Sequence, residues 1–274
     1  MYILQFGATG QVSGELLRAA AGQGVRIEAL TRRAVDLSDV DEVEQAIRDA
    51  NADAVINAAA FTAVDLAEQD EDEAFAVNAA APAAMAKACE ARCLPFIHLS
   101  TDYIFNGRQS APYLEDDAPD PINVYGRSKL AGEEAVGAFD LDHIILRTSW
   151  VYSAMGRNFV KTMLRLGEEH GSVRVVEDQI GAPTAAADIA NAVLEIAKRY
   201  GEDVRPPSGV YHFTGAGRLS WADFAEEIFR AADMSIDVIR IPTSQFPTPA
   251  ERPANSVLDC SKIERTFGIK PRSL

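Results

Sequence analysis

The segment FGATGQVSGELL, residues 6–17, follows the apolar run YILQF at 2–6 and opens a stretch with helical periodicity. Gly7 and Gly10 have the spacing of a tight turn between a strand and a helix, where the missing Cβ atoms let a pyrophosphate approach the backbone. The helix N-terminus adds free N–H groups and a partial positive charge. The segment predicts a dinucleotide site, although Ser13 stands where a third glycine is expected, and a plain tight turn is the alternative.

Apolar strands alternate with helical segments over the first 150 residues. The predicted strands are 2–6, 25–30, 53–57, 95–100 and 143–148, and the predicted helices are 10–22, 39–50, 70–92 and 124–138. Strands that are apolar throughout and separated by helices predict a parallel sheet covered on both faces. We therefore expect an α/β protein with a Rossmann-type doubly wound parallel sheet.

The second half of the chain has a looser pattern, with shorter pieces. It predicts helices at 157–169, 184–199 and 220–232, the last with Ser220 as N-cap, strands at 172–177, 210–213 and 236–241, a turn at 205–209 and a proline-rich loop at 242–253. These pieces are short for an independent domain of ordinary size. We expect 1–150 to form the NAD(P)-binding domain and 151–274 to form mainly a small substrate-binding lobe, with parts that return to the Rossmann sheet.

Composition narrows the function classes. The 274 residues carry a net charge of −15, which argues against nucleic-acid binding because phosphate backbones need a basic surface. An anionic small ligand stays possible. Three cysteines, Cys89, Cys93 and Cys260, form neither a disulfide framework nor a zinc spacing, which fits a reducing cytoplasm. The chain opens without a signal peptide and holds no long apolar run, so we expect a cytoplasmic protein without a membrane span.

The end of the second predicted strand bears on the choice of cofactor. An acidic residue there accepts from the ribose 2′-hydroxyl of NAD, whereas an arginine accommodates the 2′-phosphate of NADP. The stretch LTRRAVDLSD at 30–39 places Arg32 and Arg33 for the phosphate, with Asp36 and Leu37 beside the adenine. The pattern favours NADPH; NADH stays possible, and a solvated loop is the alternative for the two arginines.

Small and polar side chains follow the third and fourth predicted strands. NAAAFT at 57–62 lets a cofactor lie against the backbone, so we expect Ala60, Phe61 and Thr62 to edge the ribose and nicotinamide. LSTDYIF at 99–105 brings Thr101 to the same edge of the sheet, because ligands of such sheets sit at the carboxyl ends of the strands.

The stretch NVYGRSKLAGEEAV at 123–136 places Tyr125 and Lys129 four residues apart on one helix face. A Tyr-x-x-x-Lys pair alone is a weak motif. Beside Thr101, however, the phenol and the ammonium can converge on one carbonyl group. A phenol titrates near pH 10, and a nearby ammonium stabilises the phenolate. We therefore expect Lys129 to lower the pKa of Tyr125.

These motifs form a set that spans residues 6 to about 259. It resembles the extended branch of the short-chain dehydrogenase/reductase superfamily, and within it the dTDP-4-dehydrorhamnose reductases, through FGATGQV, NAAAFTAVDLAE, STDYIFNG, NVYGRSKLAGE, RTSWVY, NFVKTMLRL, DQIGAPT and PTPAERPANSVLD. The resemblance implies NADPH- or NADH-dependent reduction of the C4 ketone of dTDP-4-dehydro-L-rhamnose to dTDP-L-rhamnose.

The resemblance also implies roles for single residues. Tyr125 is the proton donor, Lys129 holds the nicotinamide ribose and Thr101 hydrogen-bonds the reacting oxygen. It also implies that Asp102 and Trp150 contact the sugar. Gly10, Gln11 and Val12 are expected to contact the pyrophosphate, and Asp36 and Leu37 the adenosine. A core role for Trp150 and a helix-capping role for Asp102 stay open.

Several alternatives remain at this stage. The chain can be another nucleotide-sugar epimerase or dehydratase of the superfamily, or a non-catalytic regulatory subunit, and it can be a monomer or a homodimer. Mg²⁺ is implied by family analogy only, and we assign no metal ligands because no compact carboxylate cluster stands out. Arg252 and Lys161 are candidates for the substrate's pyrophosphate, and a solvated surface role is the alternative for both. The chain ends at KPRSL, where we expect relatives to continue with another helix.

Overall fold

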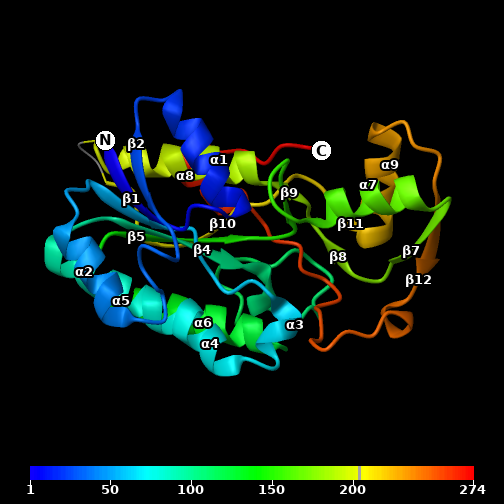
Figure 1. The fold of residues 1–274 in the computed structure, drawn as a ribbon, viewed down its shortest axis with the longest axis horizontal. Helices are drawn as coiled ribbons and strands as arrows, with labels where there is room; N and C mark the ends of the chain where they lie inside the picture. Colours follow the sequence, from blue (N-terminus) through cyan, green and yellow to red (C-terminus); the bar gives the residue numbers. More distant parts are fainter. Residues whose placement is uncertain (203–204) are drawn as a thin grey trace.

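The computed structural model of the protein describes residues 1–202 and 205–274. Its centre is a six-stranded parallel sheet with the strand order β10-β5-β4-β3-β1-β2 (Figure 1). The strands are β1 (Tyr2–Phe6), β2 (Arg26–Leu30), β3 (Ala54–Asn57), β4 (Phe96–Thr101), β5 (His143–Thr148) and β10 (Gly209–His212). The chain passes from β1 to β2 on one side and then starts β3 on the other. This reversal opens a crevice at the carboxyl ends of β1 and β3. The predicted fold class is confirmed.

Helices cover both faces of the sheet (Figure 1). One face carries α1 (Gln11–Ala21) and α8 (Ala186–Arg199), and the other carries α2 (Val40–Asp49), α5 (Ala81–Arg92) and α6 (Val124–Gly137). Strand β1 shows the sequence basis, because successive side chains of a strand point to opposite faces. Ile3 packs in the cluster with α1 and α8, while Leu4 and Phe6 pack in the cluster with α2 and α5.

The predicted helix 70–92 is helical from Glu71 to Arg92, but its middle is not an α-helix. The segment is α4 (Glu71–Phe75), a π-helical segment η1 (Ala76–Ala80) and α5. Pro82 explains the change, because it lacks the N–H group that would bond to the carbonyl of Asn78 one turn earlier. Gly132 of α6 packs there instead: a Cβ atom at this glycine would lie 2.1 Å from the Asn78 carbonyl oxygen.

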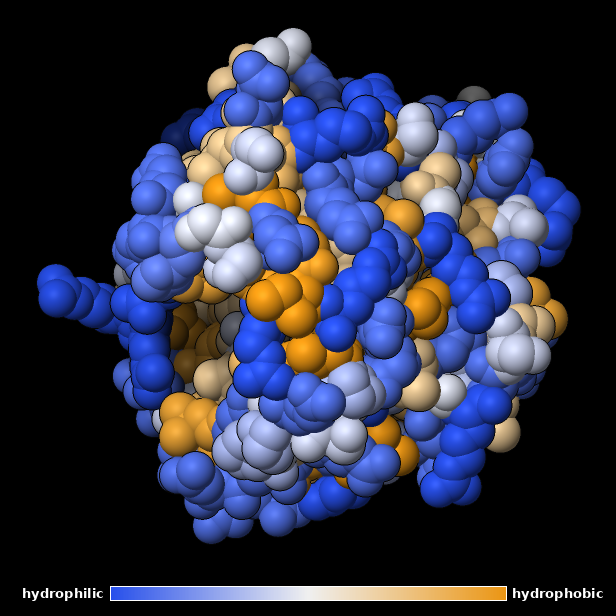
Figure 2. Space-filling view, turned by 90° about the vertical axis from the view of Figure 1, so that its right-hand side faces the viewer, coloured by the Kyte–Doolittle hydropathy of each residue, from blue (hydrophilic) through white to orange (hydrophobic). Residues whose placement is uncertain are grey.

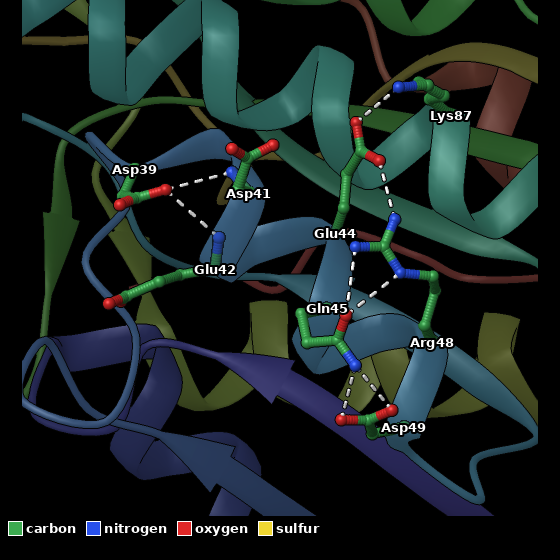
Figure 3. A network of polar contacts seen from close by, with 8 residues as sticks. All are labelled: Asp39, Asp41, Glu42, Glu44, Gln45, Arg48, Asp49 and Lys87. Carbon is green, nitrogen blue, oxygen red and sulfur yellow. Dashed lines mark hydrogen bonds and ion pairs between the residues drawn. The ribbon is translucent and has the colours of Figure 1, made fainter.

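Polar contacts hold α2 against α5 on the outer face (Figure 3). The Asp39 carboxylate caps α2 by accepting from the backbone N–H groups of Asp41 and Glu42, at 3.0 and 3.2 Å. Glu44 accepts from Arg48 of its own helix at 2.8 Å and from Lys87 of α5 at 2.7 Å. These contacts position the helix that follows the predicted adenosine site.

The far end of the molecule is a small lobe with its own core. It contains α7 (Phe159–Glu169), α9 (Trp221–Ala231) and the strand pair β7 (Ser172–Val176) with β12 (Asp237–Ile241). Ser220 caps α9 in a reciprocal box with Asp223, as predicted. Figure 2 faces this end and shows apolar residues between charged ones, with a recess that has an apolar wall.

The rest of residues 151–274 is divided between the lobe and the main sheet. β10 pairs with β5 at the sheet edge, and α8 and α10 (Ser261–Phe267) pack in the core cluster under α1. The shortest elements were not predicted from the sequence. These are the strands β6 (Val151–Tyr152), β8 (Ile180–Gly181), β9 (Thr184–Ala185) and β11 (Leu219–Ser220), the helices α10 and α3 (Val64–Ala67), and the 3₁₀ segments η2 (Asp102–Ile104) and η3 (Thr243–Gln245). Pieces of two to seven residues carry too little periodicity to be recognised. Within the described residues, no helix has the length and apolar character needed to cross a membrane.

Candidate active site

A cavity of about 820 Å³ lies at the carboxyl ends of β1, β3 and β4. With the exception of Arg33, the residues predicted for the cofactor, the reaction or the sugar line it: Gly7, Gly10, Gln11, Val12, Arg32, Asp36, Leu37, Ala60, Phe61, Thr62, Thr101, Asp102, Tyr125, Lys129 and Trp150. Residues far apart in the chain therefore meet in one cavity.

The glycine turn forms a cradle for a dinucleotide. Gly7 has φ +96°, and a Cβ atom there would lie 2.9 Å from Ser13 Oγ and 3.2 Å from the Ala58 carbonyl carbon. Ser13, in the place of the expected third glycine, donates a hydrogen bond to the Ala58 carbonyl at 3.2 Å and so ties α1 to the end of β3. No side chain of the described residues caps α1 at Gly10, so the first N–H groups remain available to a pyrophosphate.

Asn78 of η1 positions the loop that carries Phe61. Its Oδ1 accepts from the Phe61 backbone N–H at 2.8 Å, and its Nδ2 donates to the Phe61 carbonyl at 3.0 Å. The same Nδ2 donates to Ser128 Oγ of α6 at 3.0 Å. The π-helical segment therefore fixes one wall of the cavity, and no sequence pattern marked Asn78.

The predicted basic residues divide into two groups. Arg32 lines the cavity and pairs with Glu73 at 3.0 Å. Arg33 and Lys161 do not line the cavity. Arg252 lies outside its lining too and pairs with Asp65 of α3 at 2.8 Å, so its guanidinium is already engaged. The pKa of the Asp65 carboxyl is lowered, chiefly by this arginine.

Thr101, the last residue of β4, and Asp102, the first residue of η2, lie in a buried corner. Thr101 Oγ1 accepts from the Tyr103 backbone N–H at 3.2 Å and donates to Asp102 Oδ1 at 3.0 Å. Thr101 and not Asp102 therefore caps η2. Asp102 Oδ2 has no hydrogen-bond partner within 1–202 and 205–274. Burial raises the pKa of this carboxyl to about 7, although the nearby Ser256 and Thr101 hydroxyls lower it in part.

Tyr125 and Lys129 lie one turn apart on α6, but their electrostatics differ from the expectation. Burial raises the pKa of Tyr125 to about 12; the Thr101 hydroxyl lowers it, and the Asp102 charge raises it. Burial lowers the pKa of Lys129 to about 8. The predicted lowering of the tyrosine pKa by an ammonium is therefore wrong. Nζ of Lys129 instead donates to the Leu99 carbonyl at 2.7 Å.

A buried ion pair between α6 and β5 lies next to this part of the site. Glu133, one turn after Lys129, accepts from Arg147 of β5 at 3.0 Å on Oε1 and at 2.6 Å on Oε2. The Ser100 hydroxyl donates to the same carboxylate. Both charged side chains are only 4% exposed. Each therefore needs the opposite charge of the other to offset the free-energy cost of losing its water.

Two tryptophans form the wall near the small lobe. Trp150 has φ +46°, and its ring stacks on Trp221 with 3.4 Å between centroids and 5° between planes. Gly181 leaves room for the indole, because a Cβ atom there would lie 2.3 Å from Trp150 Cε2. Trp221 and Arg157 also line the cavity and were missed, since neither stands in a motif of the first domain.

Metal ligation has no candidate in the part of the chain that the structure describes. No group of three or more His, Cys, Asp or Glu side chains is placed to hold an ion there.

The fold and the cavity together define a class of protein. A doubly wound sheet with a glycine turn after β1, a threonine at the end of β4 and a Tyr-x-x-x-Lys pair on the next helix has the architecture of the short-chain dehydrogenase/reductases. More narrowly, the chain belongs to the family described as the RmlD substrate binding domain, whose model matches residues 1–274. The resemblance noted in the sequence is confirmed.

Individual relatives agree with this assignment. The chain is 48% identical over 272 residues to a Sinorhizobium fredii protein named dTDP-4-dehydrorhamnose reductase, covering 96% of this chain and 90% of that protein. A crystal structure of a dTDP-4-dehydrorhamnose reductase from Clostridium acetobutylicum matches with a TM-score of 0.94 and 37% identity, covering 100% of this chain and 95% of that one. The Bacillus anthracis enzyme of the same name, solved in complex with NADP, matches with a TM-score of 0.93 and 33% identity over 99% and 94% of the two chains.

Proposed function

We propose that this protein reduces the C4 ketone of dTDP-4-dehydro-L-rhamnose to dTDP-L-rhamnose with NADPH. One observation carries the proposal: the hydroxyl of Thr101, the phenol of Tyr125 and the amine of Lys129 line the same cavity as a glycine turn fit for a dinucleotide. The relatives named dTDP-4-dehydrorhamnose reductase, one of them solved with NADP, support it.

The residues have the following proposed roles. NADPH held at Gly7 and Gly10 would supply a hydride to the carbonyl carbon. Tyr125 gives its phenolic proton to the carbonyl oxygen, and its raised pKa keeps that proton in place until the oxygen becomes basic. The Thr101 hydroxyl turns from Asp102 Oδ1 to donate its hydrogen bond to the same oxygen. Lys129 binds the nicotinamide ribose.

Basic side chains in the cavity are available to an anionic cofactor and substrate. The described lining residues include Arg32, Lys129 and Arg157, beside the carboxyl groups of Asp36, Glu73 and Asp102. We propose that Arg32 leaves Glu73 to bind the 2′-phosphate of NADPH, because a phosphate carries about two negative charges near pH 7 and a carboxylate carries one. Asp102 and Trp150 lie where a sugar would extend beyond the reacting carbon. We further expect a cytoplasmic monomer or homodimer.

The test is turnover with a defined substrate. Purified protein should consume NADPH absorbance when dTDP-4-dehydro-L-rhamnose is added, with dTDP-L-rhamnose as the product. The Tyr125→Phe variant should lose about 10²- to 10⁴-fold in kcat while still binding NADPH. Tyr211→Phe is the matched control, because the Tyr211 hydroxyl bonds to the Pro207 carbonyl in the outer part of the sheet.

Two results would contradict the proposal. Unchanged NADPH absorbance with this substrate would exclude the reductase, and NAD retained through purification would then favour an epimerase or dehydratase. Full turnover by Tyr125→Phe would exclude the assigned proton donor. Activation of a partner enzyme without any turnover would favour a regulatory subunit.

A further inference from the structure

The loop 153–158, which joins β6 to α7, is tied to the first turns of α1. Nδ2 of Asn158 donates to Oε1 of Gln11 at 2.8 Å. Oγ of Ser153 donates to Oε1 of Glu15 at 2.7 Å. Both ends of the loop are therefore fixed to the helix that follows the glycine turn, although the two segments are far apart in the chain. None of the roles proposed above uses this loop.

The middle of the loop packs on the same helix. A Cβ atom at Gly14 of α1 would lie 2.5 Å from Cε of Met155, and one at Gly156 would lie 3.3 Å from Cγ of Gln11. The two glycines therefore let the loop lie close against α1. Because no side chain of the described residues caps this helix at Gly10, the loop lies against the turn whose backbone N–H groups are free.

Arg157 is the charged residue of the loop, and it lines the cavity. It is exposed, and its side chain makes no ion pair or hydrogen bond within the described part of the chain. The two other basic residues of the described lining are engaged. Arg32 pairs with Glu73, and Lys129 donates to the Leu99 carbonyl. Arg157 can therefore bind an anion without first losing a partner.

Acidic residues leave the positive charge of Arg157 unneutralised. Glu15, which is 6% exposed, accepts from Ser153 and lies 3.4 Å from Nη1 of Arg18. The acidic residues of the described lining belong to other parts of the fold: Asp36 before α2, Glu73 on α4 and Asp102 on η2. Arg157 therefore gives the α1 side of the cavity a positive charge.

We propose that Arg157 binds the pyrophosphate of the dinucleotide cofactor, and that the loop 153–158 holds it beside the start of α1 for this purpose. The inference rests on the proposed function, from which it takes the cofactor. The forked donors of a guanidinium match the oxygens of a phosphate group, and their hydrogen bonds are charge-assisted. The free N–H groups of α1 would hold the same group. Arg157 is thus a cofactor-binding residue that the second half of the chain contributes.

The position of the loop distinguishes the pyrophosphate from the other polar parts of the ligands. The 2′-phosphate is proposed to bind Arg32, which follows β2. The sugar is proposed to extend toward Asp102 and Trp150. The loop instead contacts Gln11, directly after the glycine turn. The pyrophosphate is the part of a dinucleotide that binds at such a turn.

The test is the affinity of the Arg157→Ala variant for NADPH and for NADH, measured by isothermal titration calorimetry without substrate. Both cofactors contain the pyrophosphate, so both Kd values should rise by the same factor, about tenfold. Loss of a contact with the 2′-phosphate would affect NADPH alone. The ratio of variant to wild-type Kd should fall toward about threefold when salt is raised to roughly 0.5 M, because salt screens exposed charges.

Two further variants separate the contact from a general effect of charge. Arg157→Lys keeps the charge but loses the fork of donors, so its Kd values should rise less, about threefold. Arg165→Ala removes a positive charge from α7, where Arg165 pairs with Glu169 at 2.7 Å on the surface. This control should leave both Kd values unchanged.

Three results would overturn the proposal. A rise in Kd for NADPH alone would assign Arg157 to the 2′-phosphate. Unchanged Kd values would exclude a contact with the cofactor, and a higher KM for the sugar nucleotide would then assign Arg157 to the diphosphate of the substrate. An equal rise in Arg165→Ala would reduce the effect to net charge. A protein that gives the expected Kd values but reduces no dTDP-4-dehydro-L-rhamnose would refute the proposed function and leave the role of Arg157 standing.

Discussion

Asn in place of Asp102 should change how the stability of the protein depends on pH. Burial raises the pKa of this carboxyl from 3.8 to about 7. The folded protein therefore binds one proton more than the unfolded chain between these two values, and its free energy of unfolding falls as the pH rises through that window. Three pKa units at 1.36 kcal/mol each make the loss about 4 kcal/mol by pH 8. An asparagine has no such loss because it does not ionise.

The measured quantity is the free energy of unfolding of the Asp102→Asn variant minus that of the wild type. We expect this difference to grow by about 4 kcal/mol between pH 4 and 8, in favour of the variant. Urea titrations at several pH values measure it, and the other carboxyl groups cancel because both proteins share them. Oδ1 is retained, so the hydrogen bond from Thr101 persists.

The control is Asp116→Asn, at an exposed position, for which the difference should stay flat over the same range. A flat difference for Asp102→Asn would refute the reasoning. It would mean that the carboxylate is solvated or fully bonded in the folded protein and that its Oδ2 is not the isolated atom the structure indicates.

Three further substitutions test other parts of the structure. Arg32→Ala should raise the KM for NADPH about tenfold and leave that for NADH nearly unchanged, because a charged hydrogen bond contributes ~1.5–3 kcal/mol; equal effects on both cofactors would contradict the phosphate role. Gly132→Ala should lower the free energy of unfolding by about 2 kcal/mol in urea, because its Cβ would lie 2.1 Å from the Asn78 carbonyl oxygen, and an unchanged value would refute that contact. Arg147→Met should lower it by about 3–5 kcal/mol at pH 7, because the charge of Glu133 stays buried without a partner, and recovery on adding Glu133→Gln checks the cause.

The sheet and the cofactor turn were predictable because their signals are local. An apolar strand, two glycines and the start of a helix lie within the first 17 residues, and the strand ends bring Thr101 and Tyr125 into one cavity by topology alone. The parts that were missed depend on distant partners. Trp221 reaches the cavity from the small lobe, and Asn78 acts through a helix distorted at Pro82.

The protonation states were the least accessible from sequence. The spacing of Tyr125 and Lys129 predicts proximity, but the sign of a pKa shift depends on burial and on which group each side chain contacts. Lys129 turned out to contact a histidine ring and a carbonyl, and the phenol lies in a desolvated corner. Arg252 likewise looked free for a phosphate until the fold placed Asp65, far away in the chain, against it.

The stacked pair of Trp150 and Trp221 gives the protein an intrinsic tryptophan fluorescence signal that reports on the cavity. These are the only two indoles in the chain, and both are in the wall of the cavity. Their ultraviolet emission therefore arises from one spot, and rings 3.4 Å apart and nearly parallel couple their electronic transitions. Any ligand that separates or covers them changes the emission and the near-ultraviolet circular dichroism together, so occupancy can be followed without a dye and without catalysis.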